Sequence, residues 1–242
     1  MSRLASLNSV AEPEIESIAR RLEGASPPEV LEWAVETYGE GLTLSVSFGG
    51  AEGMVLLDML SRITGRVRVF TLDTGFLFRE TLRFRAEVMR RYRLPLEVVR
   101  PQLTITQQAA RFGERLYAHD PDFCCRMRKV EPLERALRGY AAWVTGIRRE
   151  QTAQRRETPV VGWEERFGVV KIAPLARWSS EQVEEYVRER GVPVNPLLER
   201  GYRSIGCEPC TRPVGIGEDD RAGRWDGFEK TECGLHWVKE GA

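Results

Sequence analysis

Residues 42–50, LTLSVSFGG, decide the fold, and the rest of the chain can be interpreted outward from them. Most of the run is apolar or β-branched and it ends in two glycines, which is typical of a strand that closes in a turn. Beyond the glycines, apolar side chains recur at near-helical spacing from Met54 to Ile63. In an open α/β sheet, a turn between a parallel strand and a helix is where backbone N–H groups bind phosphate.

The alternation of strand and helix continues along the chain. Strand-like runs occupy residues 67–72, 96–99, 141–146 and 169–172. A helix of about sixteen residues is expected after Gly75, and Thr104 and Ser179, each followed three positions later by Gln, are typical N-caps of two further helices. Two short helices within residues 11–39 are expected to cap the core. The pattern predicts an α/β fold with a doubly wound, mainly parallel sheet.

The character of the sequence changes after Gly191. Proline and glycine interrupt regular structure from there on, and residues 215–227 are rich in charge and glycine. We therefore expect residues 1–213 to form the α/β domain with its helical cap, and residues 214–242 to form a mobile C-terminal tail. A chain of 242 residues is long enough for such a domain.

The bulk composition limits the partners and the compartment. Lys and Arg together number 36, as do Asp and Glu, so net charge favours neither a nucleic acid nor a membrane surface as partner. No apolar run approaches the length of a membrane span or the core of a signal peptide. We expect a cytoplasmic protein, in which thiols stay reduced and cysteines serve metal binding and catalysis rather than disulfides.

The five cysteines divide into two pairs and a single residue. Cys207 and Cys210 form a Cys-x-x-Cys motif, Cys124 and Cys125 are adjacent, and Cys233 stands alone. The first pair by itself would suit structural zinc or a redox disulfide as well as a cluster. Adjacent cysteines converge poorly on one tetrahedral ion, whereas in a 4Fe-4S cluster each thiolate binds a different iron. The two pairs together favour one 4Fe-4S cluster, which leaves Cys233 free.

Basic side chains provide candidate anion sites. Arginines are concentrated in residues 146–156 and recur at Arg221 and Arg224, and guanidinium groups suit sulfate and phosphate oxygens. A solvated surface is the ordinary alternative for any one of them. The glycine loop lacks the lysine of a Walker A motif, so an ordinary strand-to-helix turn remains an equal alternative there.

Cys233 lies between two basic residues, Lys230 and His236. Neighbouring positive charge lowers the pKa of a thiol and makes it a nucleophile. The alternative is an inert cysteine beside a surface histidine.

These motifs resemble those of the assimilatory adenylylsulfate (APS) reductases from about residue 40 onward. The resemblance is carried by Cys124-Cys125 with Arg128-Lys129 behind it, by Cys207-x-x-Cys210, by the SFGGAE loop of residues 47–52, and by the ECGLH sequence of residues 232–236. Phosphoadenylylsulfate (PAPS) reductases of the cluster-free type share the fold and the tail but lack both cysteine pairs. The sequence therefore resembles the iron-sulfur branch, with its adenine nucleotide alpha hydrolase-like fold.

The resemblance implies a reaction and a set of site residues. APS would be reduced to sulfite and AMP by thioredoxin, through a thiosulfonate on Cys233, as a step of sulfate assimilation and cysteine biosynthesis. A 4Fe-4S cluster held by Cys124, Cys125, Cys207 and Cys210 would orient the sulfate end without carrying electrons. The substrate-binding residues would be Ser45, Ser47, Phe48, Gly49, Gly50, Leu72, Lys129, Gly146, Arg156, Arg221, Arg224 and His236.

Several alternatives stay open at this stage. The enzyme could use PAPS instead of APS, or both, because one further cation would suffice for a 3′-phosphate. A tRNA-thiolating ATP pyrophosphatase would need an SGGxDS loop, which residues 47–52 do not match. A non-enzymatic iron-sulfur sensor would leave Cys233 without a role. The sequence does not choose between Arg155 and Arg156, between thioredoxin and glutaredoxin, or between a monomer and a homo-oligomer.

Overall fold

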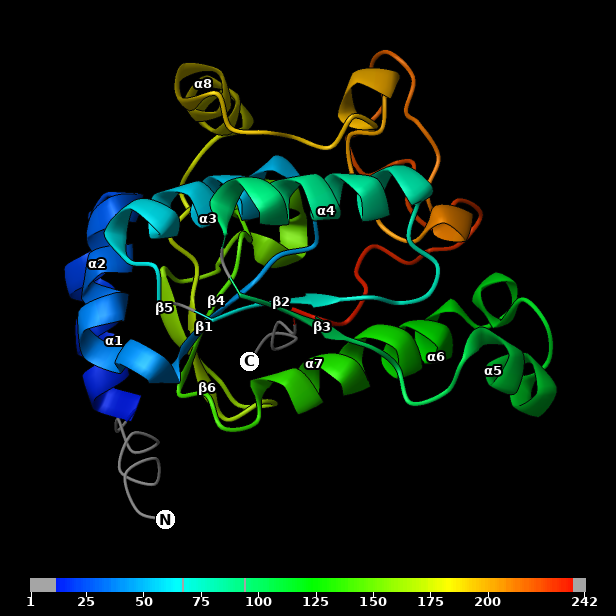
Figure 1. Ribbon diagram of the computed structural model, residues 1–242, viewed down its shortest axis with the longest axis horizontal. Coiled ribbons are helices and arrows are strands. Elements are labelled where there is room, and N and C mark those ends of the chain that lie inside the picture. Colours follow the sequence, from blue (N-terminus) through cyan, green and yellow to red (C-terminus); the bar gives the residue numbers. More distant parts are fainter. Residues whose placement is uncertain (1–11, 67, 94, 237–242) are drawn as a thin grey trace.

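A single six-stranded sheet forms the centre of the molecule (Figure 1). The computed structural model describes residues 12–66, 68–93 and 95–236, and the strand order is β3-β2-β1-β4-β6-β5. All neighbouring strands are parallel except β5 and β6, which are antiparallel. The strands are β1 (Leu42–Ser45), β2 (Arg68–Leu72), β3 (Leu96–Val99), β4 (Ala142–Val144), β5 (Val161–Glu164) and β6 (Val169–Ile172). The prediction of a mainly parallel sheet is confirmed.

Helices cover both faces of this sheet, as expected for a doubly wound fold. α3 and α4 lie on one side and α7 on the other (Figure 1), with α2 and α8 packed against α3. The helices are α1 (Glu12–Leu22), α2 (Pro27–Tyr38), α3 (Ala51–Ile63), α4 (Arg79–Tyr92), α5 (Ile105–Phe112), α6 (Pro121–Cys125), α7 (Glu131–Leu137) and α8 (Ser180–Arg190).

The two predicted N-caps are confirmed. The Thr104 hydroxyl accepts a hydrogen bond from the Gln107 N–H at 3.1 Å, and the Gln107 side chain accepts one from the Thr104 N–H at 3.0 Å. Ser179 and Gln182 form the same reciprocal pair at the start of α8. Each reciprocal pair of hydrogen bonds, known as a capping box, satisfies N–H groups that have no partner within the helix at its N-terminus.

Two regions have structure that the sequence patterns did not predict. β5 was missed because it is only four residues long and contains Gly162; it pairs with β6 through a tight turn in which Gly168 has a φ of +63°. Residues 121–137 form α6, a π-helical turn (Arg126–Val130) and α7. Pro121 and Pro132 each lie in the first two positions of their helices, which tolerate proline.

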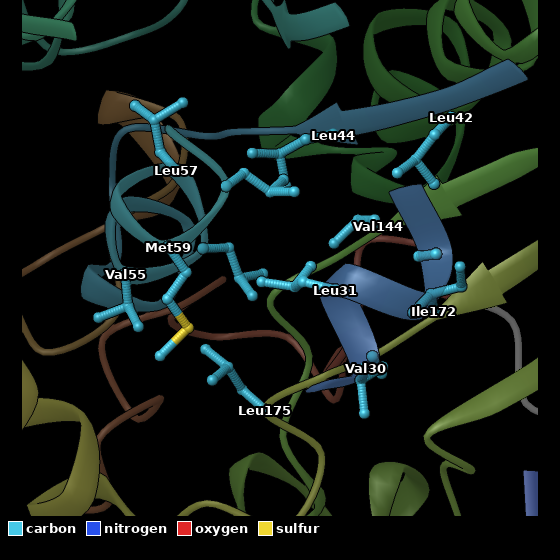
Figure 2. Packing of buried hydrophobic residues seen from close by; sticks show 14 of the residues in the cluster. Val30, Leu31, Leu42, Leu44, Val55, Leu57, Met59, Val144, Ile172 and Leu175 are labelled. Atoms are coloured by element: carbon cyan, nitrogen blue, oxygen red, sulfur yellow. The ribbon is translucent and has the colours of Figure 1, made fainter. Parts of the chain in front are cut away.

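The core has one part on each face of the sheet, because successive side chains of a buried strand point to opposite faces. Val144 and Leu44 pack with α2 and α3 in the larger part, which Figure 2 shows together with Leu31 and Ile172. The neighbouring Trp143 points to the other face and packs with residues of α7 in a smaller cluster. Burial on both faces fixes the register of the central strands.

Asp58 of α3 joins three helices at one buried carboxylate. Its Oδ1 accepts a hydrogen bond from the Tyr92 hydroxyl of α4 at 3.1 Å. Its Oδ2 accepts one from the Tyr186 hydroxyl of α8 at 2.9 Å and one from Arg62 Nε at 2.9 Å. Burial would raise the pKa of Asp58, but the bonds from Arg62, Tyr186 and Tyr92 outweigh it and lower that pKa below its ordinary value.

We expect Asp58→Ala to lower the free energy of unfolding by about 3 kcal/mol at pH 7, because the partly buried hydroxyls of Tyr92 and Tyr186 lose their acceptor. The pKa of Asp58 is lower in the folded protein than in the unfolded chain. The stability that its ionised carboxylate contributes is therefore present above the unfolded-state pKa of ~3.9, and it is lost as the pH falls through the pKa of the folded state. Urea unfolding at several pH values measures both effects. Glu184→Ala, at an exposed position of α8, is the control; an equal loss in both variants would contradict the prediction.

Candidate active site

A cavity of about 350 Å³ opens at the carboxyl ends of the parallel strands. Ser45, Leu72 and Gly146, which end or follow β1, β2 and β4, line it. This edge is where open α/β sheets bind ligands. All three were predicted from the sequence to contact substrate, and the structure brings them to one cavity.

The glycine loop after β1 forms one wall of this cavity. Ser47, Gly49 and Gly50 line it, and α3 begins directly after Gly50, so the N–H groups of its first turn lie beside the cavity. A Cβ on Gly49 would lie 2.7 Å from the carbonyl oxygen of Ile205. Only glycine therefore allows this loop to approach the Cys-x-x-Cys segment so closely.

Phe48 has a different place from the one predicted for it. Its side chain is buried and packs edge-on against Phe84 of α4, at 6.4 Å between ring centroids, and it does not line the cavity. Its φ of +56° is unusual for a bulky residue, and its carbonyl accepts a hydrogen bond from Asn195 at 2.8 Å. Phe48 thus anchors the loop in the core while its neighbours face the cavity.

The four paired cysteines surround a second, smaller cavity. Cys124 and Cys125 end α6, and an isolated bridge with Leu77 places Cys207 opposite them. The Thr74 hydroxyl lies 3.3 Å from the Cys207 sulfur. All five cysteines of the chain are free thiols in this structure.

The arrangement of these thiols bears on the kind of metal they could hold. Among the described residues, no group of three or more His, Cys, Asp or Glu side chains is arranged so that it could hold a metal ion. Four thiols nevertheless line the smaller cavity, and a 4Fe-4S cluster takes four thiolates, each of which binds its own iron. The types of residue present are thus compatible with such a cluster.

Lys129 connects the two cavities. It lies in the π-helical turn after Cys125, is buried, and lines both cavities, as does Cys207. Its ammonium is 5.6 Å from the centre of the Trp225 ring. Burial would lower the pKa of Lys129, but the nearby thiols of Cys207, Cys233 and Cys125 outweigh it and raise that pKa. The raised pKa favours the charged ammonium of Lys129, which lies between the paired cysteines and the main cavity.

Five arginines line the main cavity: Arg148, Arg155, Arg203, Arg221 and Arg224. Arg156 is exposed and does not line it. The expectation for Arg156 is therefore corrected to Arg155, because in the 3-10 helix η5 (Ala153–Arg155) and the turn after it only the first of the two adjacent side chains points inward.

Several buried nitrogen atoms at this cavity have no hydrogen-bond partner among the described residues. They are Arg221 Nε, Arg224 Nε and His236 Nδ1. A buried donor that stays unpaired costs about 1–3 kcal/mol. Their convergence on one cavity indicates a site for an anionic acceptor.

Cys233 lies half-buried in the same cavity. Burial would raise the pKa of its thiol, but Lys129, the Leu235 N–H and Arg224 outweigh it, and the pKa is lowered. A lowered pKa gives the thiolate that a nucleophile requires.

The cations that act on Cys233 are not the neighbours expected from the sequence. Lys230 pairs with Asp122 of α6. His236 stacks on Trp143 at 5.4 Å between ring centroids, and burial together with Lys171, Arg155 and Arg221 lowers its pKa well below the ordinary value. The lowered pKa favours the neutral imidazole of His236, and Lys129 and Arg224 are the cations that lower the pKa of Cys233.

Two carboxylates at the site were not singled out from the sequence. Glu52 follows the glycine loop and accepts hydrogen bonds from Arg148 at 3.0 Å and from Gln151 at 2.9 Å. Glu232 precedes Cys233 and pairs with Arg155. Both belong to the quoted motifs, but an acidic residue in such a motif gives no sequence signal that it binds an arginine far along the chain.

Comparison with known proteins gives the family. The model of the phosphoadenosine phosphosulfate reductase domain matches residues 41–213. The phosphoadenosine 5′-phosphosulfate reductase of Gloeobacter violaceus is 49% identical, over 92% of this chain and 93% of that protein. The adenosine 5′-phosphosulfate reductase of Streptomyces coelicolor is 48% identical, over 91% of this chain and 92% of that protein.

Solved structures agree with this assignment. The phosphoadenylyl-sulfate reductase of Candida auris, solved as a phosphate complex, superposes with a TM-score of 0.75 at 34% identity, over 85% of this chain and 98% of that one. The FMN adenylyltransferase of Candida glabrata has a TM-score of 0.57 at 16% identity, over 95% of this chain and 81% of that one, and shares the fold. With its sequence matched over most of its length, the chain belongs to the phosphoadenosine phosphosulfate reductase family.

Proposed function

We propose that this chain reduces adenylylsulfate to sulfite and AMP, with Cys233 as the nucleophile. The observation that carries the proposal is the meeting of a thiol of lowered pKa with buried, unpartnered guanidinium donors in one cavity. Relatives at 42–48% identity that are named adenosine 5′-phosphosulfate reductases support it.

We propose that the nucleotide lies along the cavity. Backbone groups near Leu72 and Gly146 hold the adenine, and the loop from Ser45 to Gly50 holds the ribose and phosphate. The sulfate then faces Cys233 and the donors of Lys129, Arg155, Arg221, Arg224 and His236. Binding the sulfate would satisfy the donors that lack partners without substrate.

The reaction divides into two displacements at sulfur. The Cys233 thiolate attacks the sulfate sulfur, the bond from that sulfur to the phosphate oxygen breaks, and AMP leaves with the electron pair. Cys233 then carries an S-sulfo group. One thiol of an external dithiol, which we take to be thioredoxin, attacks the Cys233 sulfur and releases sulfite with the bonding pair. Its second thiol resolves the mixed disulfide and restores Cys233 as a thiol, so the dithiol supplies both electrons.

The four paired cysteines are proposed to hold one 4Fe-4S cluster. When bound, that cluster would supply a fixed charge beside the sulfate end of the cavity rather than electrons. Lys129 lies between the cysteine cavity and the substrate cavity, so its ammonium can bind a sulfate oxygen while the thiolates hold it in place.

The tail is proposed to move during this cycle. Residues 214–236 form irregular structure without a helix or strand, and they lie against the cavity in this structure. Cys233 must face the sulfate in one step and an external dithiol in the next, which supports a tail distinct from the domain of residues 1–213. No helix in the described part of the chain is long and apolar enough to cross a membrane; we propose a cytoplasmic location.

Sulfite release from APS and from PAPS by anaerobically purified protein, with reduced thioredoxin, tests the proposal. We expect turnover of APS, because the relatives at 42–48% identity are named adenosine 5′-phosphosulfate reductases. Comparable turnover of PAPS would make the chain a dual reductase. A colourless protein that releases no sulfite from either nucleotide would contradict both the reaction and the cluster.

A further inference from the structure

Glu232 holds the segment that carries Cys233 against the body of the protein. Its Oε1 accepts hydrogen bonds from Arg155 Nε at 2.7 Å and from the Thr152 hydroxyl at 3.1 Å. Its Oε2 accepts one from Arg155 Nη2 at 2.7 Å, and Arg221 Nη2 lies 3.5 Å away. The side chains of Glu232 and Arg155 are 16% and 8% exposed. A bidentate, largely buried ion pair between a guanidinium and a carboxylate is among the stronger polar contacts in proteins.

Side chains alone fix this part of the tail. Among the described residues, no backbone-to-backbone hydrogen bond involves residues 229–236, and none of them lies in a helix or strand. Arg221 Nη2 donates to the Thr231 carbonyl at 2.7 Å, and Arg166 Nη1 donates to the Gly234 carbonyl at 3.2 Å. The other anchors are the Gln154 amide on the Thr231 hydroxyl at 2.9 Å, the pairing of Lys230 with Asp122, the stack of His236 on Trp143, and the packing of Leu235 against the cluster of Trp143. Glu232, directly beside Cys233, makes the most contacts in this set.

A carboxylate at this position is unfavourable for the chemistry itself. Its charge opposes ionisation of the adjacent Cys233 thiol, and it pairs with two arginines that face the sulfate position. A negative charge beside a nucleophile and an anion site is therefore expected to serve a purpose that outweighs these effects.

We propose that Glu232 is a positioning residue: bound by Arg155 and Arg221, it holds Cys233 over the cavity for attack on the sulfate, and its release opens the tail. This inference rests on the proposed function, in which Cys233 alternates between the sulfate and an external dithiol. Because main-chain pairing is absent from this segment, breaking the Glu232 contacts removes its main fixed point without unfolding an element.

The test compares Glu232→Gln with Glu229→Gln, which changes an exposed carboxylate of the same tail. The first readout needs no activity: the rate at which iodoacetamide alkylates Cys233, followed by peptide mass spectrometry. We expect Glu232→Gln to raise this rate about 10-fold, since a weakened charge-assisted pair leaves the tail open more often. Unchanged thermal unfolding would show that the fold is intact.

The second readout separates the two chemical steps. Without reductant, we expect S-sulfo-Cys233 to form about 10- to 100-fold more slowly in Glu232→Gln, while its release by reduced thioredoxin proceeds at least as fast as in the wild type. If the carboxylate acted only by opposing ionisation of the thiol, formation would instead become faster. Either that acceleration, or alkylation equal to that of Glu229→Gln, would overturn the proposal.

Arg155→Gln and the double variant complete the test. If Glu232 acts through Arg155, the two changes are non-additive in the alkylation rate, and additive effects would contradict the pairing. Failure of the proposed function is a distinct result: the wild type would form no S-sulfo-Cys233, whereas the alkylation rates would still report whether Glu232 closes the tail.

Discussion

Cys233→Ser is expected to lower sulfite release from APS by about 10⁴-fold or more. The hydroxyl is a far weaker nucleophile than the thiolate, whose ionisation Lys129, the Leu235 N–H and Arg224 promote in this structure. An S-sulfo group cannot form on serine, so no intermediate remains for a dithiol to reduce. The measurement is sulfite production with reduced thioredoxin, together with the mass of the protein after incubation with APS alone.

Two controls make this result specific to the nucleophile. AMP affinity should stay within about 2-fold of the wild type, because serine preserves the shape of the cavity. Iron content and visible absorption should also be unchanged, since Cys233 is not among the four cysteines that surround the smaller cavity. Loss of the cluster in Cys233→Ser would mean that Cys233 is a ligand, and sulfite release at the wild-type rate would remove it from the reaction.

The parallel part of the fold could be predicted from the sequence because its signals are local. The strand β1, the glycine loop and α3 form one continuous pattern, and the caps Thr104 and Ser179 act within a single turn. β5 could not be found in this way. Its four residues gain their place by pairing with β6, which is a tertiary effect that overrides weak local preference.

The cysteines of the site could be predicted, but the groups around them could only partly be. Pairs of thiols carry a strong spacing signal. By contrast, whether Arg155 or Arg156 turns inward depends on one turn of 3-10 helix, and the lowered pKa of His236 depends on its burial and on Lys171. The orientation of Arg155 and the pKa of His236 both depend on packing between residues far apart in the chain, and the types of residue do not indicate that packing.

Lys129→Met is expected to slow formation of S-sulfo-Cys233 about 10²- to 10³-fold, the usual effect of removing one preorganised donor from a developing anion. Methionine keeps the length and apolar stem of the side chain but removes the only basic group among the described residues that lines both cavities. Single-turnover formation of the intermediate, followed by mass spectrometry without reductant, measures this step alone.

The pH dependence of the same variant separates two roles of Lys129. Among the groups that lower the Cys233 pKa, Lys129 has the largest effect, so its removal raises that pKa. The rate of Lys129→Met should then climb with pH through the alkaline range, where the wild-type thiol is already ionised and its rate is flat. If high pH restores the full rate, Lys129 acts by ionising Cys233; if a deficit of about 10-fold or more persists, it also stabilises the sulfate in the transition state.

Arg126→Met is the control, because it removes an exposed charge from the same π-helical turn. This variant should leave both the rate and its pH dependence unchanged. An equal loss of rate in Arg126→Met would assign the effect to the turn rather than to the ammonium of Lys129.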